Sequence, residues 1–321
     1  MANDNPGPSK AFTRYAWIFV SYMILVILFG AWVRITGSGD GCGANWPDCH
    51  GDFIPEIDEH ATLIEYTHRV TAGILGPMGL VLIGWAYKRF GTNRVFWASI
   101  VTMAFIIFES LIGAGLVLAE LVGDDDSVAR AVVIAIHLVN TLALTGSAAL
   151  VAWWSTGKPL PRWSRRTTLT WLMLVAIGGL VATSMSGAVT ALGDTLFPTD
   201  PTIGDGLFAQ IRDDLSPANH FLVRLRFVHP VVAILLAAYL MVLSWIVRLR
   251  DVPPLVDRWA GWALALVVLQ TVLGVVNIML AAPGWIQILH LLLAQLVWLA
   301  VLFLTLATMM PPGSESSSPT D

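Results

Sequence analysis

Residues 66–87, YTHRVTAGILGPMGLVLIGWAY, hold a single charged side chain, Arg69, in a run long enough to cross a bilayer. A helix needs about 20 mostly apolar residues to span a hydrocarbon core of about 30 Å. The whole chain of 321 residues has this character, because 56% of its residues are hydrophobic and only 12% are charged. Soluble domains carry roughly 25% charged residues. The sequence therefore predicts an all-α integral membrane protein.

The chain contains eight such apolar runs, and each is expected to form one transmembrane helix. The predicted spans are 14–33, 66–87, 95–119, 129–154, 169–191, 220–247, 259–282 and 285–309. An even number of spans places both ends of the chain on the same side of the membrane.

Positive charge is concentrated in one set of connections, as expected for loops on the cytoplasmic side. With both termini cytoplasmic, the basic residues on that side are Lys10, Arg14, Lys88, Arg89, Arg94, Lys158, Arg162, Arg165, Arg166, Arg248, Arg250 and Arg258. The opposite loops hold acidic clusters such as Asp124 to Asp126. The N-terminal tail resembles neither a secretory signal nor a mitochondrial presequence, which favours a prokaryotic cell membrane.

The second four spans repeat features of the first four. Residues 68–72, HRVTA, align with 229–233, HPVVA, and 109–113, ESLIG, align with 270–274, QTVLG, at one offset of 161 residues. Parallel repeats of this kind are related by an axis along the membrane normal. We expect two pseudo-symmetric four-helix bundles. The expected divisions are a cytoplasmic tail at 1–13, a first half at 14–154 with an outer loop at 34–64, a cytoplasmic linker at 155–168, a second half at 169–309 and a disordered tail at 310–321.

Spans 2, 4, 6 and 8 each have a histidine within their first two or three turns, namely His68, His137, His229 and His290. At a rise of about 1.5 Å per residue, all four lie within about 15 Å of the outer helix ends, and hence at one depth. A lone intramembrane histidine can simply hydrogen-bond a neighbouring helix. Four at one depth, in two repeated pairs, favour ligation of a metal.

The residue types point to haem iron as the ligated metal. Two neutral imidazoles from facing helices provide both axial ligands of a haem. A zinc site would need further Cys or carboxylate ligands. A di-iron site would need paired Glu-x-x-His elements, and only Glu65 with His68 forms one. The predicted ligand pairs are His68 with His137, and His229 with His290.

The two halves differ around their first histidines. Glu65 lies three residues before His68 and shares its helix face, whereas Arg226 lies three residues before His229, with Arg224 nearby. Glu65 could relay protons or stabilise developing charge, or it could complement the N-terminal dipole of its helix. The two arginines could contact haem propionates or anchor a helix end among lipid headgroups. Glu109, which aligns with Gln270, is left without an assigned role.

Both cysteines, Cys42 and Cys49, fall in the first outer loop, where the compartment permits disulfides. A disulfide between them is expected. A redox-active or metal-binding pair stays open, although a C-x2-C spacing is absent.

The first outer loop and second span contain a motif made of Gly37-Ser38-Gly39, Cys42-Gly43, Trp46-Pro47, Cys49-His50-Gly51 and Glu65-Tyr66-Thr67-His68-Arg69, and the later spans add His137, His229-Pro230 and His290. This combined motif resembles the haem A synthase family. It covers residues 14–309, and the cysteines match bacterial forms with a pair in the first outer loop. The second half departs from those forms with two pairs, because its long outer loop at 192–219 has no cysteine.

The resemblance implies the chemistry. Haem O would bind between His68 and His137 as substrate, haem b would stay between His229 and His290 as cofactor, and Glu65 would be catalytic. The C8 methyl group of haem O would be oxidised to the formyl group of haem A, for use in terminal oxidases. The implied partners are the lipid bilayer, a haem O synthase and an electron donor; nothing in the chain indicates nucleic acid.

Two other functions use the same four histidines. A dihaem b-type electron carrier would leave its porphyrins unchanged and gives no reason for Glu65 or the cysteines. A haem transporter or delivery protein would need broken polar helices near the membrane midplane, and the sequence indicates none there.

Overall fold

The computed structural model describes residues 7–161, 167–198, 212 and 214–310. Eight helical segments in this part are long and apolar enough to cross a membrane. They are α1 (Lys10–Ile35), α2 (His60–Phe90), α3 (Arg94–Leu118), α4 (Val128–Ser155), α5 (Thr168–Leu196), α7 (Phe221–Leu225) with α8 (Val228–Arg248), α9 (Pro254–Met279) and α10 (Gly284–Thr308). The prediction of an all-α protein with eight spans is confirmed. Arg162, Arg165, Arg166 and the tail at 311–321 lie outside the described residues.

Short polar residues begin several of the helices. Asn93 accepts hydrogen bonds from the backbone N–H groups of Val95 and Phe96 at the start of α3, at 2.9 and 3.4 Å. Ser127 accepts one from the N–H of Arg130 at the start of α4, at 3.1 Å. These caps satisfy N–H groups that have no partner in the first helical turn. At these positions the change from polar loop to helix is stabilised by a side chain.

The sixth span, predicted at 220–247, contains a break. Helix α7 ends at Leu225 and α8 begins at Val228. Pro230 accounts for the break, because its ring excludes the carbonyl of Arg226 four residues earlier and it has no N–H to donate. His229 is consequently the second residue of α8, whereas His68 lies well inside α2.

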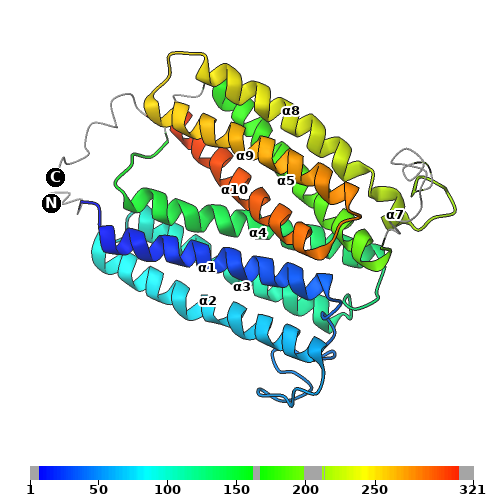
Figure 1. The fold of residues 1–321 in the computed structure, drawn as a ribbon. Helices are drawn as coiled ribbons and strands as arrows, with labels where there is room; N and C mark the ends of the chain where they lie inside the picture. The colour runs from blue at the N-terminus through cyan, green and yellow to red at the C-terminus, as the bar shows by residue number, and fades with distance from the viewer. Residues whose placement is uncertain (1–6, 162–166, 199–211, 213, 311–321) are drawn as a thin grey trace.

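The helices form two rings of four that lie side by side (Figure 1). In the first ring each helix packs against the next in the order α1, α2, α3, α4, and α4 closes the ring against α1. The second ring repeats this order with α5, α8, α9 and α10. The α2–α4 pair and the α8–α10 pair are thus opposite corners of their rings. These are the helices that carry the four histidines.

The two rings meet through equivalent helices. Helix α4 packs against α5, and α1 packs against α10, as a twofold relation between the rings requires. At mid-depth the indole N–H of Trp298 on α10 donates to the carbonyl of Leu142 on α4 at 2.9 Å. At the end of the bundle where the chain enters α1, Trp153 of α4 stacks on Phe303 of α10 with ring centroids 4.6 Å apart. The histidines lie toward the other end, which we call the histidine end.

Candidate functional site

His229 and His290 approach each other across the middle of the second ring. Their ring centroids lie 6.4 Å apart and their planes cross at 89°. A metal bound by an imidazole lies about 2.0 Å from the ring nitrogen, which puts the centroids of two opposite axial ligands about 6.3 Å apart. The centroid separation matches this value, whereas the Nε2 atom of His290 faces the side-chain nitrogen of Gln270 in the structure.

The orientation of His229 is fixed by helix α5. Its Nδ1 lies 3.1 Å from the carbonyl oxygen of Thr183 and 3.3 Å from the hydroxyl of Ser186. Because a carbonyl can only accept a hydrogen bond, Nδ1 carries the proton in this contact. The neutral ring then has its lone pair on Nε2, which is the arrangement that metal-ligating histidines usually show.

His290 is held by an amide instead of a carbonyl. Its Nε2 lies 3.1 Å from the side-chain nitrogen of Gln270 on α9. Among the described residues, its buried Nδ1 has no hydrogen-bond partner. An unpaired buried polar atom is destabilising by about 1–3 kcal/mol, so this ring is incompletely satisfied by the protein alone.

His68 and His137 occupy the matching corners of the first ring. The buried Nδ1 of each has no hydrogen-bond partner within the described part of the chain. The edge of Phe29 packs on His68 with centroids 5.7 Å apart. A carboxylate oxygen of Glu109 lies 3.6 Å from Nδ1 of His137. The rings of His229 and His290 thus lie close together, and the pairing of His68 with His137 stays a prediction.

Glu109 has partners that the sequence did not suggest. Its carboxylate accepts hydrogen bonds from the side chains of Asn140, at 2.5 Å, and Thr141. Both partners follow His137 on α4, so Glu109 connects α3 to the helix that carries this histidine.

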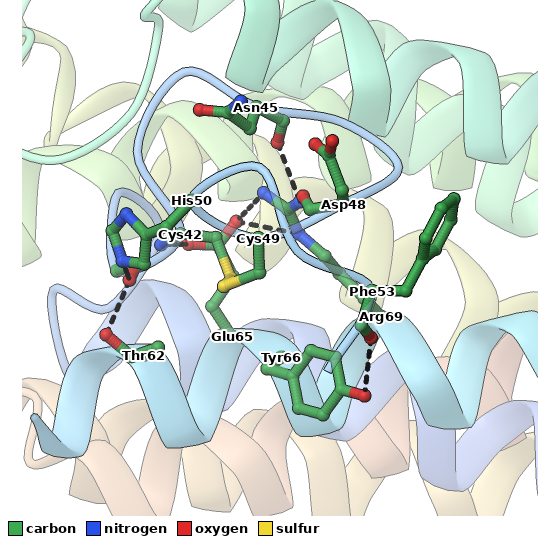
Figure 2. Close-up of a disulfide and its surroundings, with 11 residues drawn as sticks. Cys42, Asn45, Asp48, Cys49, His50, Phe53, Thr62, Glu65, Tyr66 and Arg69 are labelled. Atoms are coloured by element: carbon green, nitrogen blue, oxygen red, sulfur yellow. Dashed lines mark hydrogen bonds and ion pairs between the residues drawn. A yellow bond between two sulfur atoms is a disulfide. The ribbon is translucent and has the colours of Figure 1, made fainter. Parts of the chain in front are cut away.

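Glu65 is buried beneath the first loop, with only 4% of its surface exposed (Figure 2). One carboxylate oxygen accepts the backbone N–H of Cys42 at 2.8 Å. The other accepts two N–H groups of Arg69, at 3.1 and 2.5 Å. Arg69 in turn donates to the carbonyls of Asn45 and Asp48, at 2.7 and 2.5 Å. Glu65 therefore joins helix α2 to the loop above it.

The loop itself is closed by the predicted disulfide, which is confirmed. The sulfur atoms of Cys42 and Cys49 lie 2.01 Å apart. The hydroxyl of Thr62 on α2 donates to the carbonyl of Gly41 at 2.6 Å, beside the same loop (Figure 2). The disulfide loop is consequently fixed to the turn of α2 that precedes His68.

The two arginines near His229 have different surroundings. Arg224 is exposed. Arg226 has its side chain only 10% exposed and lies 3.0 Å from a carboxylate oxygen of Asp194 and 3.8 Å from one of Asp214. It also donates to the carbonyls that end α5. Arg226 therefore binds carboxylates of the protein, and its predicted contact with haem propionates stays a prediction.

Arg34 is a residue that sequence reasoning missed. It lies one turn beyond Gly30 on α1 and donates to the carbonyl of Ala191 on α5 at 2.5 Å and to Gln287 on α10 at 2.9 Å. Its third acceptor is the hydroxyl of Thr195. Arg34 thus ties the first ring to two helices of the second at the histidine end.

Comparison with known proteins gives the family. The profile of the COX15-CtaA family, described as cytochrome oxidase assembly protein, matches residues 13–302. A protein of Thermus thermophilus named protohaem IX farnesyltransferase is 41% identical over 278 residues, which cover 86% of this chain and 45% of that protein. The chain therefore spans less than half the length of this relative.

Shorter matches carry a different name. A haem A synthase of Halalkalibacterium halodurans is 44% identical over 96 residues, covering 30% of this chain and 32% of the relative. One of Alkalihalophilus pseudofirmus is 42% identical over 109 residues, covering 34% and 37%. With bacterial relatives and eight apolar helices, the protein is a multi-pass protein of a prokaryotic cell membrane.

Proposed function

The chain belongs to the COX15-CtaA family of cytochrome oxidase assembly proteins, the haem A synthase family, and we propose from this that it oxidises haem O to haem A. The proposed reaction converts the C8 methyl group of the porphyrin into a formyl group. Two successive hydroxylations of the methyl group would give a geminal diol, and loss of water would leave the formyl group; an external oxidant would take up the four electrons removed from the carbon.

The observation that most supports the proposal is the His229–His290 pair. Their ring centroids lie 6.4 Å apart, and these two residues would hold the iron of a haem bound in this half. The contact of His229 Nδ1 with the Thr183 carbonyl leaves Nε2 free to ligate. We propose that this half holds a haem b, which supplies single-electron transfer when bound.

The first half is proposed to hold haem O between His68 and His137. Glu65 lies on the same face of α2 as His68 and is the carboxylate nearest to this ligand in the sequence. We propose that it is catalytic and that it also keeps the disulfide loop above the substrate site. Its contacts with Cys42 and Arg69 support this second role.

The name of the Thermus relative suggests a different reaction, transfer of a farnesyl group to protohaem IX. That relative extends well beyond the matched segment, so its named activity need not reside in the part that this chain shares. The two activities are consecutive in chemistry, because haem O is the farnesylated haem. A haem O synthase and an electron donor are accordingly proposed as partners.

Extraction of pigments from cells tests the proposal. The protein is expressed together with a haem O synthase, and the haems are separated by chromatography and identified by mass. We expect haem A. Unchanged haem O with bound haem in the protein would favour a dihaem electron carrier. Conversion of protohaem to haem O in cells without the synthase would favour a farnesyltransferase. Absence of any haem spectrum would favour transport.

A further inference from the structure

Three of the four histidines lie edge-on against a glycine of a neighbouring helix. A Cβ atom built on Gly30 of α1 would lie 3.1 Å from Cε1 of His68. One built on Gly187 of α5 would lie 3.0 Å from Cε1 of His229. Carbon atoms in good van der Waals contact lie about 3.5–4.0 Å apart. Any side chain at these two positions would push the imidazole away.

The third contact is in the second half. A Cβ atom on Gly274 of α9 would lie 3.1 Å from Cε1 of His290. The same ring meets Gln270 one turn away on α9, with its Nε2 at 3.1 Å from the amide nitrogen. The His290 ring therefore contacts α9 at two points: its Cε1 edge lies against Gly274, and its Nε2 faces the amide of Gln270.

The first two contacts are equivalent in the repeat. Helices α1 and α2 of the first ring correspond to α5 and α8 of the second, so Gly30 and Gly187 play the same part in the two halves. Glycine is a poor helix former compared with alanine. Its presence at both positions is explained by the close approach of the imidazole.

The fourth contact is missing. Gly113 of α3 aligns with Gly274 in the sequence repeat, yet no atom of the described residues lies within 4 Å of the place its Cβ would take, its own helix backbone aside. Near His137 the structure instead places a carboxylate oxygen of Glu109, at 3.6 Å from Nδ1. The side chain of His137 is also 33% exposed. His137 thus lacks the support that its counterpart His290 has.

We propose that Gly30, Gly187 and Gly274 are positioning residues that hold the imidazole edges of His68, His229 and His290, and that His137 is the one ligand free to move. The inference rests on the proposed haem sites. Both ligands of the second half are held, which suits a cofactor that stays bound. One ligand of the first half is not held, which suits a substrate that must enter and a product that must leave.

A haem-transfer experiment tests the inference. The purified haem-loaded protein is mixed with excess apomyoglobin, and transfer of haem is followed by absorbance. We expect a fast phase from the first half and a slow phase from the second. The phases are assigned with a His229→Ala protein, which should retain only the fast one.

The decisive comparison is between Gly274→Ala and Gly113→Ala, because these two positions are equivalent in the repeat. Gly274→Ala should increase the rate of the slow phase about tenfold or more. Removal of a group that orients a metal ligand typically weakens metal binding by at least this factor. Gly187→Ala should do the same. Gly113→Ala should leave both phases unchanged, because its methyl group meets open space. Alanine favours helix more than glycine does, so a faster release cannot be attributed to a weakened helix.

One further measurement separates the possible outcomes. Low-temperature electron paramagnetic resonance reports the ligand-ring geometry of ferric haem, and we expect Gly187→Ala and Gly274→Ala, but not Gly113→Ala, to shift the low-spin signal. Equal effects of Gly113→Ala and Gly274→Ala, or no effect of either Gly187→Ala or Gly274→Ala, would overturn the inference. A protein that binds haem and produces haem A but gives that result retains the proposed function. A protein that binds no haem loses both.

Discussion

The carboxylate of Glu65 accepts the backbone N–H of Cys42 at 2.8 Å, so the acid that precedes His68 is bound directly to the disulfide loop. Arg69 completes the link by joining the same carboxylate to two carbonyls of the loop. Position of the loop and position of the acid are therefore coupled. Removal of either one should therefore loosen the other.

Replacement of Glu65 by alanine should leave haem binding intact and stop the reaction. We expect the rate of haem A formation to fall by about 10²–10⁴-fold, the usual contribution of a positioned acid or base, with haem O or a hydroxylated haem accumulating. Separation of extracted haems measures this. Glu59→Ala is the matched control, since Glu59 is exposed and its side chain caps no N–H group. Equal activity of the two variants would exclude a catalytic role for Glu65.

Loss of the disulfide should free the loop. In a Cys42→Ser/Cys49→Ser protein we expect the free energy of unfolding to fall by about 2–3 kcal/mol, because a short closed loop restrains the unfolded chain by that amount. Thermal unfolding in detergent measures the loss. Hydrogen exchange should rise at residues 40–52 and at the N-terminal end of α2. Faster exchange confined to the loop, with α2 unchanged, would contradict the coupling through Glu65.

The number and approximate positions of the helices could be predicted, because an apolar run of about 20 residues is the length that crosses a bilayer. The start of α2 could not. It begins at His60, six residues before the predicted span at 66, because polar residues interrupt this first stretch and contacts such as Thr62 with Gly41 hold it in the helix. A scan for apolar runs does not register such contacts.

The candidate site, like the fold, could be predicted only in part. The common depth of the histidines follows from helix rise alone, and their pairing follows from the repeat. The Glu65–Arg69 ion pair was not predicted, although its i, i+4 spacing of opposite charges is the signal that could have indicated it. The acceptors of Arg34 were not visible, because Ala191 and Gln287 are more than 150 residues away in the chain. Only the packing of the two rings brings them together.

Arg34 should matter for the association of the two rings. Replacing it by glutamine removes charged hydrogen bonds to α5 and α10, and we expect the free energy of unfolding to fall by about 2 kcal/mol. Thermal unfolding in detergent provides the measurement. Arg14→Gln is the control, because Arg14 lies on the same helix but lines an exposed groove. Equal stability of the two variants would mean that Arg34 contributes nothing to the contact between rings.

Each haem should depend on its own histidine pair. His229→Ala removes one axial ligand of the second half, and we expect this variant to lose the haem b of that half while still binding haem O in the first. His68→Ala should show the reverse loss. Quantitative haem analysis of the purified proteins distinguishes the two, because haem b and haem O differ in mass. His60→Ala serves as control, since His60 is exposed at the start of α2, two turns before His68.

If either ligand variant lost both haems while remaining folded by circular dichroism, the two rings would not bind haem independently. The repeat would then describe the ancestry of the chain and not two separate sites. If each variant lost only its own haem, the activity of His229→Ala would show whether the second haem is needed for turnover, and we expect that activity to be lost.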